Sequence, residues 1–140
     1  MARVETELNC TPHSVETARR FIETALAVWE LDDLNACAML LTSELVTNAI
    51  LHARTAVRLV AERTDKELVV EVWDGAPCAM AAPRHAGVSE TGRGLLRETG
   101  RGLLLETGRG LLLVDRLASR WGVRRVGQRK VAWFALPLMM

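Results

Sequence analysis

Residues 40–53 of the chain, LLTSELVTNAILHA, set polar side chains into an otherwise apolar helix. Residues four apart share one face of an α-helix. Three polar side chains follow this spacing, namely Glu44, Asn48 and His52. Three apolar side chains form the neighbouring stripe, namely Leu41, Leu45 and Ala49. A polar stripe in an apolar helix is either a solvated edge or part of a site, and the rest of the chain has to distinguish the two.

Upstream of this stretch, the sequence predicts an edge strand followed by a first helix. Residues 1–9 have the mixed character of an edge strand. Thr11, which is followed by proline, is a helix-start signal, because a hydroxyl can cap free N–H groups and proline fits the first helical position. Apolar residues then recur at helical spacing as far as Trp29. We expect Asp32 or Asp33 to cap the second helix, which contains the polar stripe.

The segment after the second helix is predicted to form a β-hairpin. Residues 56–62 are β-prone and partly alternating, and a polar turn joins them to residues 67–73. In this second strand, Leu68, Val70 and Val72 share one face. Residues 74–77, Asp-Gly-Ala-Pro, are a strong chain breaker that ends the second strand. Residues 78–89 contain proline and glycine and are predicted to form a loop.

The C-terminal part is predicted to contain a third helix and a second hairpin. The helix is expected over residues 111–120, ended by the Trp-Gly pair that follows. The hairpin is expected to pair residues 123–126 with residues 130–136 across a Gly-Gln turn. Core packing is the expected role of all four tryptophans of the chain.

Together these elements predict an α+β fold, a two-layer sandwich whose mainly antiparallel sheet is covered on one face by about three helices. The composition, 49% hydrophobic and 25% charged, fits a single globular domain over residues 1–140. A net charge of +1 argues against direct nucleic-acid binding. The chain lacks an apolar run of about 18 residues and the apolar core of a signal peptide, so we expect no membrane span and a cytoplasmic location.

Familiar enzyme motifs and metal-ligand patterns do not occur in the sequence. It contains no GxxxxGK[ST], GxSxG or HExxH. The three cysteines are widely spaced and form no CxxC pair, which favours buried or incidental thiols. The three histidines are scattered, and only His52 lies near the polar stripe, one turn beyond Asn48.

One octapeptide occurs three times, as ETGRGLLR at residues 90–97 and as ETGRGLLL at residues 98–105 and 106–113. Solenoid repeats are longer, at roughly 20 to 50 residues. A continuous helix is also unfavourable, because each interior glycine costs about 1 kcal/mol relative to alanine. We favour a tandem duplication that lengthened a loop, with one copy performing the original task.

The repeat also has a functional interpretation as an anion site. Gly-Arg-Gly before a helix places free N–H groups where a phosphate can approach closely. The third copy runs into an apolar helical pattern, whereas the first copy keeps the shorter distance from Asp74. The arginine of any copy can pair with phosphate oxygens. The sequence leaves open which copy serves.

Three segments, taken in order, resemble the GHKL ATP-binding fold of histidine kinases, gyrases and heat-shock chaperones. They are SELVTNAILHA, VWDGAP, and ETGRGLLLVDRLASRWGV with the closing strand KVAWFALP. More narrowly, the chain resembles the small ATP-binding proteins of actinobacteria that are close to anti-sigma-factor serine/threonine kinases. The resemblance extends from about Thr11 to Leu138.

The resemblance implies a role for each residue that matches a family motif. Asn48 corresponds to the asparagine that binds Mg2+, and Glu44 to the carboxylate that acts as general base on a substrate hydroxyl. Asp74, followed by Gly75, corresponds to the aspartate that binds the adenine amino group. The ATP lid corresponds to the Gly-Arg-Gly motif of an earlier copy or of the third copy, which consists of Gly108, Arg109 and Gly110.

The implied function is that of an ATP- and Mg2+-binding kinase, which phosphorylates a serine or threonine of an antagonist protein and binds a sigma factor. A homodimer is a further expectation from the resemblance. The chemistry is compatible, because Mg2+ prefers oxygen ligands and phosphoryl transfer needs positioning, charge neutralisation and one base. Two alternatives are a non-catalytic module that sequesters a partner, and a degenerate paralogue that has lost nucleotide binding.

Three features depart from the pattern of the family. Gly75 follows Asp74 directly, where the superfamily usually has DxGxG. Lys130 and Val131 stand where relatives often have a threonine beside the adenine, and the Val131 side chain has no donor. We expect these two departures to weaken nucleotide affinity. The triplicated lid adds sixteen residues over a single copy, and we expect this to hinder its closure.

Overall fold

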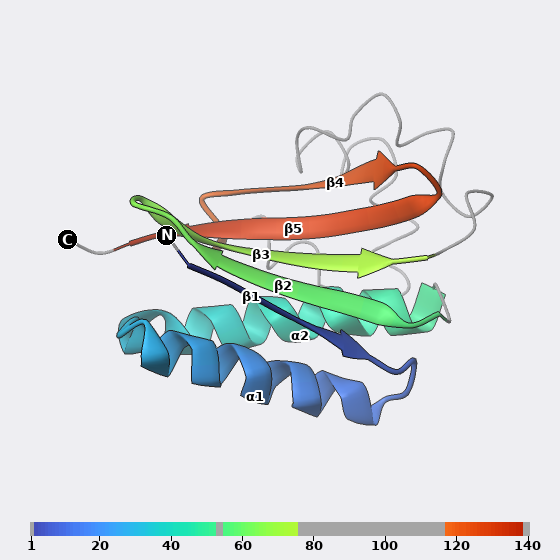
Figure 1. Cartoon of the computed structure of the whole chain (residues 1–140), viewed down its shortest axis with the longest axis horizontal. Coiled ribbons are helices and arrows are strands. Elements are labelled where there is room, and N and C mark those ends of the chain that lie inside the picture. Colours follow the sequence, from blue (N-terminus) through green and yellow to red (C-terminus); the bar gives the residue numbers. More distant parts are fainter. Residues whose placement is uncertain (1, 53–54, 76–116, 139–140) are drawn as a thin grey trace.

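A computed structural model describes residues 2–52, 55–75 and 117–138, which form an antiparallel sheet with helices on one face (Figure 1). The elements in chain order are β1 (Ala2–Leu8), α1 (His13–Val28), the 3-10 helix η1 (Asp32–Leu34), α2 (Asn35–His52), β2 (Val57–Arg63), β3 (Glu67–Asp74), β4 (Arg120–Val126) and β5 (Arg129–Pro137). The predicted α+β class, the N-terminal edge strand, the first two helices and both hairpins are confirmed.

The five strands run in the order β1-β2-β3-β5-β4, and every neighbouring pair is antiparallel. β5 is the last strand in sequence, yet it lies between β3 and β4 and pairs with β3 along its length. The β4–β5 turn contains Gly127 at a φ of 62°, a left-handed conformation that glycine adopts without steric penalty. The sheet therefore joins the two predicted hairpins through the β3–β5 pair.

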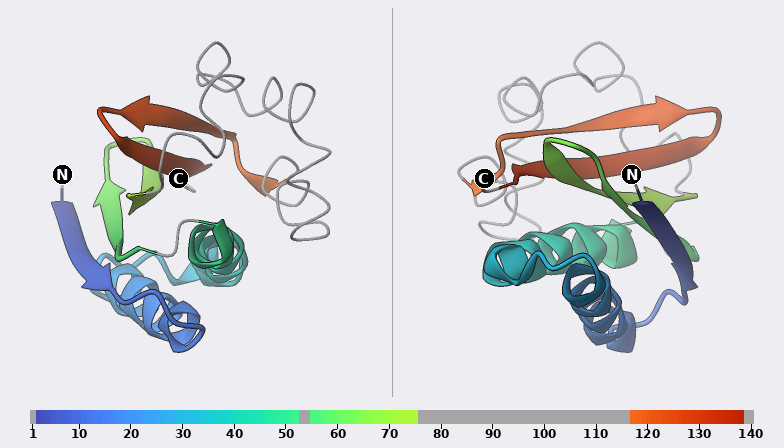
Figure 2. Two further views of the ribbon diagram at one scale, coloured as in Figure 1. Left: turned by 90° about the vertical axis from the view of Figure 1, so that its right-hand side faces the viewer. Right: turned by 60° about the vertical axis from the view of Figure 1, so that its left-hand side comes forward.

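The two helices lie side by side on one face of the sheet in both views of Figure 2. α1 has one apolar face, which buries Ala18, Ile22 and Leu26. α2 is apolar around most of its circumference, because it contacts both α1 and the sheet. Within the described residues, Asp32–Leu51 is the segment long and apolar enough to cross a membrane. Its buried side chains belong to the hydrophobic core, and this packing accounts for its composition.

Neither predicted helix cap forms as expected. Thr11 makes no side-chain cap to the backbone of α1, and its hydroxyl lies 3.3 Å from that of Ser14. Asp32 and Asp33 lie in the first turn of η1, ahead of the start of α2 at Asn35. The helix starts are therefore fixed mainly by the burial of their apolar faces rather than by side-chain caps.

Alternating burial along β3 sets the two faces of the sheet. Leu68, Val70 and Val72 point into the core on the helix side, as their spacing predicts. Asp74 is the next residue in this row and is also buried. A carboxylate is thereby placed at the end of a buried apolar row.

The predicted boundary between the third helix and the last hairpin is wrong. Arg120 and the two residues after it belong to β4, which begins three residues before the predicted position 123. Trp121 pairs with Phe134 of β5 and is only 4% exposed. Long-range pairing thus overrides the local helical pattern. Residues 111–116 of the predicted helix lie outside the described residues.

The tryptophans divide between the two faces, so the expectation of core packing is correct for only two of them. Trp29 and Trp121 belong to the core. Trp73 and Trp133 are partly exposed, and their cross-strand partners place them on the face away from the helices. Arginines stack over both rings, with Arg120 Cζ 5.3 Å from the Trp133 centroid. This distance is within the range of cation–π contacts.

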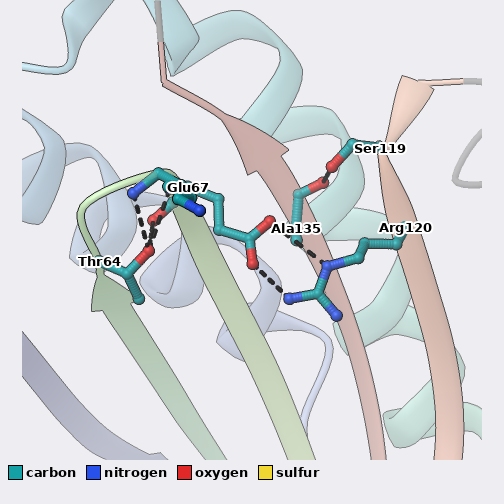
Figure 3. Close-up of polar contacts among 6 residues, drawn as sticks. Thr64, Glu67, Ser119, Arg120 and Ala135 are labelled. Carbon is teal, nitrogen blue, oxygen red and sulfur yellow. Dashed lines mark hydrogen bonds and ion pairs between the residues drawn. The ribbon is translucent and has the colours of Figure 1, made fainter.

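The same outer face contains an ion pair that bridges β3 and β4 across β5 (Figure 3). The guanidinium of Arg120 donates to the carboxylate of Glu67. Next to it, the Thr64 hydroxyl accepts the Glu67 backbone N–H at 3.1 Å and closes the β2–β3 turn. Ser119 donates its hydroxyl to the Ala135 carbonyl at 3.0 Å, which fixes the start of β4 against β5.

Candidate functional site

The helix α2 places Glu44 and Asn48 at different depths. Leu41 and Leu45 are fully packed in the core, and Asn48 follows Leu45 on the inner side with only 9% of its surface exposed. Glu44 is half-buried, and this desolvation raises the pKa of its carboxyl group. The polar stripe is therefore not a solvated edge, since one member is buried and the other is partly withdrawn from water. The side chain of His52 lies outside the described residues.

The side-chain oxygen of Asn48 is buried and has no hydrogen-bond partner among the residues that the structure describes. An unsatisfied buried polar atom costs about 1–3 kcal/mol, so such atoms need an explanation. Among the described residues, Asn35 and Thr42 also have an unpaired buried oxygen. Of the three, only Asn48 lies one helical turn from a partly buried carboxylate.

Asp74 ends β3 and is 1% exposed. In the sheet it lies between Val57 of β2 and Lys130 of β5. Lys130 Nζ is 3.7 Å from Asp74 Oδ2 and forms an ion pair with it. The carboxylate of Asp74 is thus held at a buried position next to a cation.

Residue Gly75 is fixed by a contact from the segment that follows α2. The backbone N–H of Gly75 donates to the Thr55 hydroxyl at 3.0 Å. A Cβ added to Gly75 would meet Thr55 atoms at 3.5 Å or more, which is ordinary contact. The position therefore accepts a small side chain, and the backbone there does not itself require glycine.

The C-terminal end of α2 and the end of β3 lie at the same end of the molecule (Figure 1). The short link from His52 to Val57 makes this necessary, because Val57 pairs with Asp74. α2 also packs on β3. The structure thus brings Asn48, one turn before the end of α2, to the sheet end that carries Asp74.

The predicted lid residues Gly108, Arg109 and Gly110 lie outside the described residues, as does the remainder of the repeat. Their assignment to the phosphates stays a prediction. The same holds for the choice among the three copies of the Gly-Arg-Gly motif.

The amide oxygen of Asn48 suits a hard cation whose other ligands are mainly water and phosphate oxygens. No group of three His, Cys, Asp or Glu side chains that could hold a metal ion occurs in the described part of the chain. The unpaired amide oxygen of Asn48 is a suitable ligand for Mg2+, an ion that usually retains several waters and binds phosphate oxygens. Asn48 therefore fits the metal-binding role that the family resemblance implies for it.

Two residues at this end of the sheet were not predicted as site residues. Thr55 could have been found by extending the hairpin register, because it lies two residues before the Val57–Asp74 pair. Lys130 appeared only as a departure from the family pattern, since its partner comes from the non-local β3–β5 pairing.

A family model described as "Histidine kinase-like ATPase domain" matches residues 8–136. The match extends from the last residue of β1 nearly to the end of β5 and includes Glu44, Asn48 and Asp74. A search of curated proteins finds no match.

Proposed function

The chain belongs to the histidine kinase-like ATPase domain family, and on this premise we propose that it is an ATP- and Mg2+-dependent regulatory protein kinase. It transfers phosphate to a serine or threonine of an antagonist protein and binds a sigma factor. ATP binding is the general expectation for the family. The sequence resemblance supports the narrower proposals. These are the kinase activity, the two partners, a homodimer and a cytoplasmic location.

The unpaired, buried oxygen of Asn48 is the observation that best supports a nucleotide site. A buried polar atom without a protein partner is usually satisfied by a bound ion or an ordered water. Asn48 would hold Mg2+, which when bound neutralises charge on the phosphate oxygens. Asp74, buried at the end of β3, would accept a hydrogen bond from the amino group of adenine.

Glu44 lies one turn before Asn48 and can act as the proton acceptor. Partial burial raises the pKa of its carboxyl group, which makes the carboxylate a better base than an exposed glutamate. Glu44 would accept the proton of the serine or threonine hydroxyl as that oxygen attacks the γ-phosphorus of ATP and the bond from this phosphorus to the ADP leaving group breaks.

The first test is calorimetry of the full chain with ATP, with and without Mg2+. We expect binding to depend on Mg2+ and to weaken at least tenfold in Asn48→Ala, because the ion loses a protein ligand. Asn35→Ala is the matched control, since it removes another unpaired amide oxygen from the same helix. A flat titration of the wild type would exclude the kinase and leave an ATP-independent binding module or a degenerate paralogue.

Transfer is tested with labelled ATP and an array of serine- and threonine-containing proteins. Glu44→Gln keeps the shape of the side chain but removes the base. We expect it to abolish transfer while ATP binding remains, and Glu23→Gln, on an exposed position of α1, serves as control. Binding of ATP by the wild type without transfer to any protein would favour the non-catalytic module.

A further inference from the structure

We propose that Lys130 determines nucleobase specificity together with Asp74, so that the pair reads two adjacent atoms of adenine. Asp74 accepts a hydrogen bond from the 6-amino group, and Lys130 donates one to the ring nitrogen N1. This inference rests on the proposed nucleotide site. It gives Lys130 a role in that site that the sequence resemblance does not assign.

The sheet register places the two side chains together. Asp74 and Lys130 are directly opposed in the antiparallel β3–β5 pair, and such partners point to the same face. Their charged atoms are 3.7 Å apart, which is an ion pair but exceeds a good hydrogen-bond distance. An ammonium group has three N–H donors, so Lys130 can contact the carboxylate and still donate to a ligand.

The register also explains why Val131 is not the base contact. Val131 is opposed to Trp73, which places it on the outer face of the sheet and away from Asp74. A hydroxyl group at position 131 would therefore lie on the outer face of the sheet, where it could not donate a hydrogen bond to a base beside Asp74. The side-chain donor of β5 beside Asp74 is the ammonium of Lys130.

The chemistry of the purine edge matches this pair. Adenine presents an N–H donor at the 6-position and an acceptor at N1, which suit a carboxylate and an ammonium in that order. Guanine in the same orientation presents the O6 acceptor to Asp74 and the N1–H donor to Lys130. Both contacts would then be repulsive, and unpaired charged groups in a site discriminate strongly against the wrong ligand.

The depths of the two side chains are compatible with this division of roles. The Asp74 side chain is 2% exposed, whereas the Lys130 side chain is 18% exposed. The buried carboxylate is thus fixed at the inner position, and the longer lysine reaches it from nearer the surface. The competing possibility is that Lys130 only neutralises Asp74 and touches no ligand.

An atom-specific binding experiment separates these two roles. Calorimetry would measure the Kd of the full chain for Mg-ATP, Mg-GTP and 1-deaza-ATP, in which a C–H group replaces N1. We expect the wild type to bind ATP about tenfold or more tightly than 1-deaza-ATP, since a hydrogen bond from a charged donor is lost. Lys130→Met should weaken ATP binding by about the same factor and leave 1-deaza-ATP unchanged. Lys66→Met, at an exposed turn position, is the control and should change neither value.

Three other outcomes overturn the proposal, and each does so in a distinguishable way. If Lys130→Met weakens ATP and 1-deaza-ATP equally, Lys130 is a structural counter-ion, and the nucleotide site itself stands. If the wild type binds ATP and 1-deaza-ATP equally, no donor reaches N1; this comparison needs no variant and so does not depend on the folding of Lys130→Met. If the wild type binds none of the three nucleotides, the proposed function fails together with this inference.

Discussion

The hydroxyl of Thr55 accepts the backbone N–H of Gly75 at 3.0 Å and so ties the segment after α2 to the residue after Asp74. This bond connects the helix of Glu44 and Asn48 to the strand end of Asp74. Thr55→Val keeps the shape of the side chain and removes the acceptor. We expect it to lower the free energy of unfolding by about 1 kcal/mol and to weaken Mg-ATP binding, because Gly75 loses its anchor.

The measurement is chemical denaturation together with calorimetry of Thr55→Val. Thr17→Val is the matched control, since the Thr17 hydroxyl makes only a long, exposed contact within α1. Unchanged ATP affinity in a correctly folded Thr55→Val protein would show that this anchor does not position the site.

Gly75 permits a test of close ligand approach that leaves the fold intact. The nearest atoms to an added Cβ belong to Thr55 and lie 3.5–3.9 Å away. We therefore expect Gly75→Ala to change the free energy of unfolding by less than about 1 kcal/mol. If the nucleotide contacts this backbone, ATP affinity should still fall, whereas unchanged affinity would remove Gly75 from the site.

The partial burial of Glu44 predicts a pH-dependent effect on stability. Desolvation raises the pKa of the Glu44 carboxyl group in the folded protein above the ordinary glutamate value of 4.5, so the folded state binds the proton more tightly than the unfolded state. The Glu44 contribution to stability is therefore greatest at low pH, where both states are protonated, and it is lost as the pH rises through the folded pKa. Above that value, the carboxylate destabilises the fold.

Urea denaturation across this pH range should show the effect as a difference between wild type and Glu44→Gln. The glutamine variant should gain stability relative to wild type as the pH rises from 4.5 toward neutrality. Phosphate transfer should fall as the pH decreases through the same range, because the base becomes protonated. A stability difference that does not change with pH would contradict the burial of Glu44.

The assignment of residues 120 and 121 to β4 predicts unequal effects of two neighbouring substitutions. Trp121→Ala removes a core side chain paired with Phe134, and we expect it to cost about 3–5 kcal/mol. Arg120→Ala removes an exposed ion pair with Glu67 and should cost at most about 1 kcal/mol. Equal costs in thermal or urea denaturation would argue against this register of β4.

Deletion of residues 90–105 would leave a single copy of the octapeptide and tests the duplication hypothesis. If the added copies only lengthen a loop, the deletion should leave the fold unchanged and should keep or improve ATP affinity. Calorimetry with Mg-ATP is the measurement. A collapse of affinity would mean that the added copies take part in binding.

The sequence was most informative where structure depends on local spacing. Leu41 and Leu45 repeat every four residues, and Leu68 and Val70 alternate, so the buried faces of α2 and β3 could be predicted correctly. The buried position of Asp74 follows from the same alternation. Most of the candidate site residues that the structure describes therefore lie on elements whose buried faces can be predicted from local spacing.

Features that depend on pairing between distant segments could not be predicted in this way. Arg120 and Trp121 follow a helix-like pattern, and only their pairing with β5 makes them a strand. Lys130 becomes a partner of Asp74 only through the β3–β5 register. No local property of the sequence around position 130 specifies that register.

The position of β5 between β3 and β4 also has a consequence for biosynthesis. A ribosome makes β5 after every other described strand, so β3 emerges with an edge that has no partner until the final hairpin follows. An unpaired strand edge is prone to intermolecular association. The octapeptide copies lie between β3 and β5 in sequence, so each one lengthens the time for which a nascent chain exposes that edge. We infer that repeat number influences folding yield during translation, independently of any effect on nucleotide affinity.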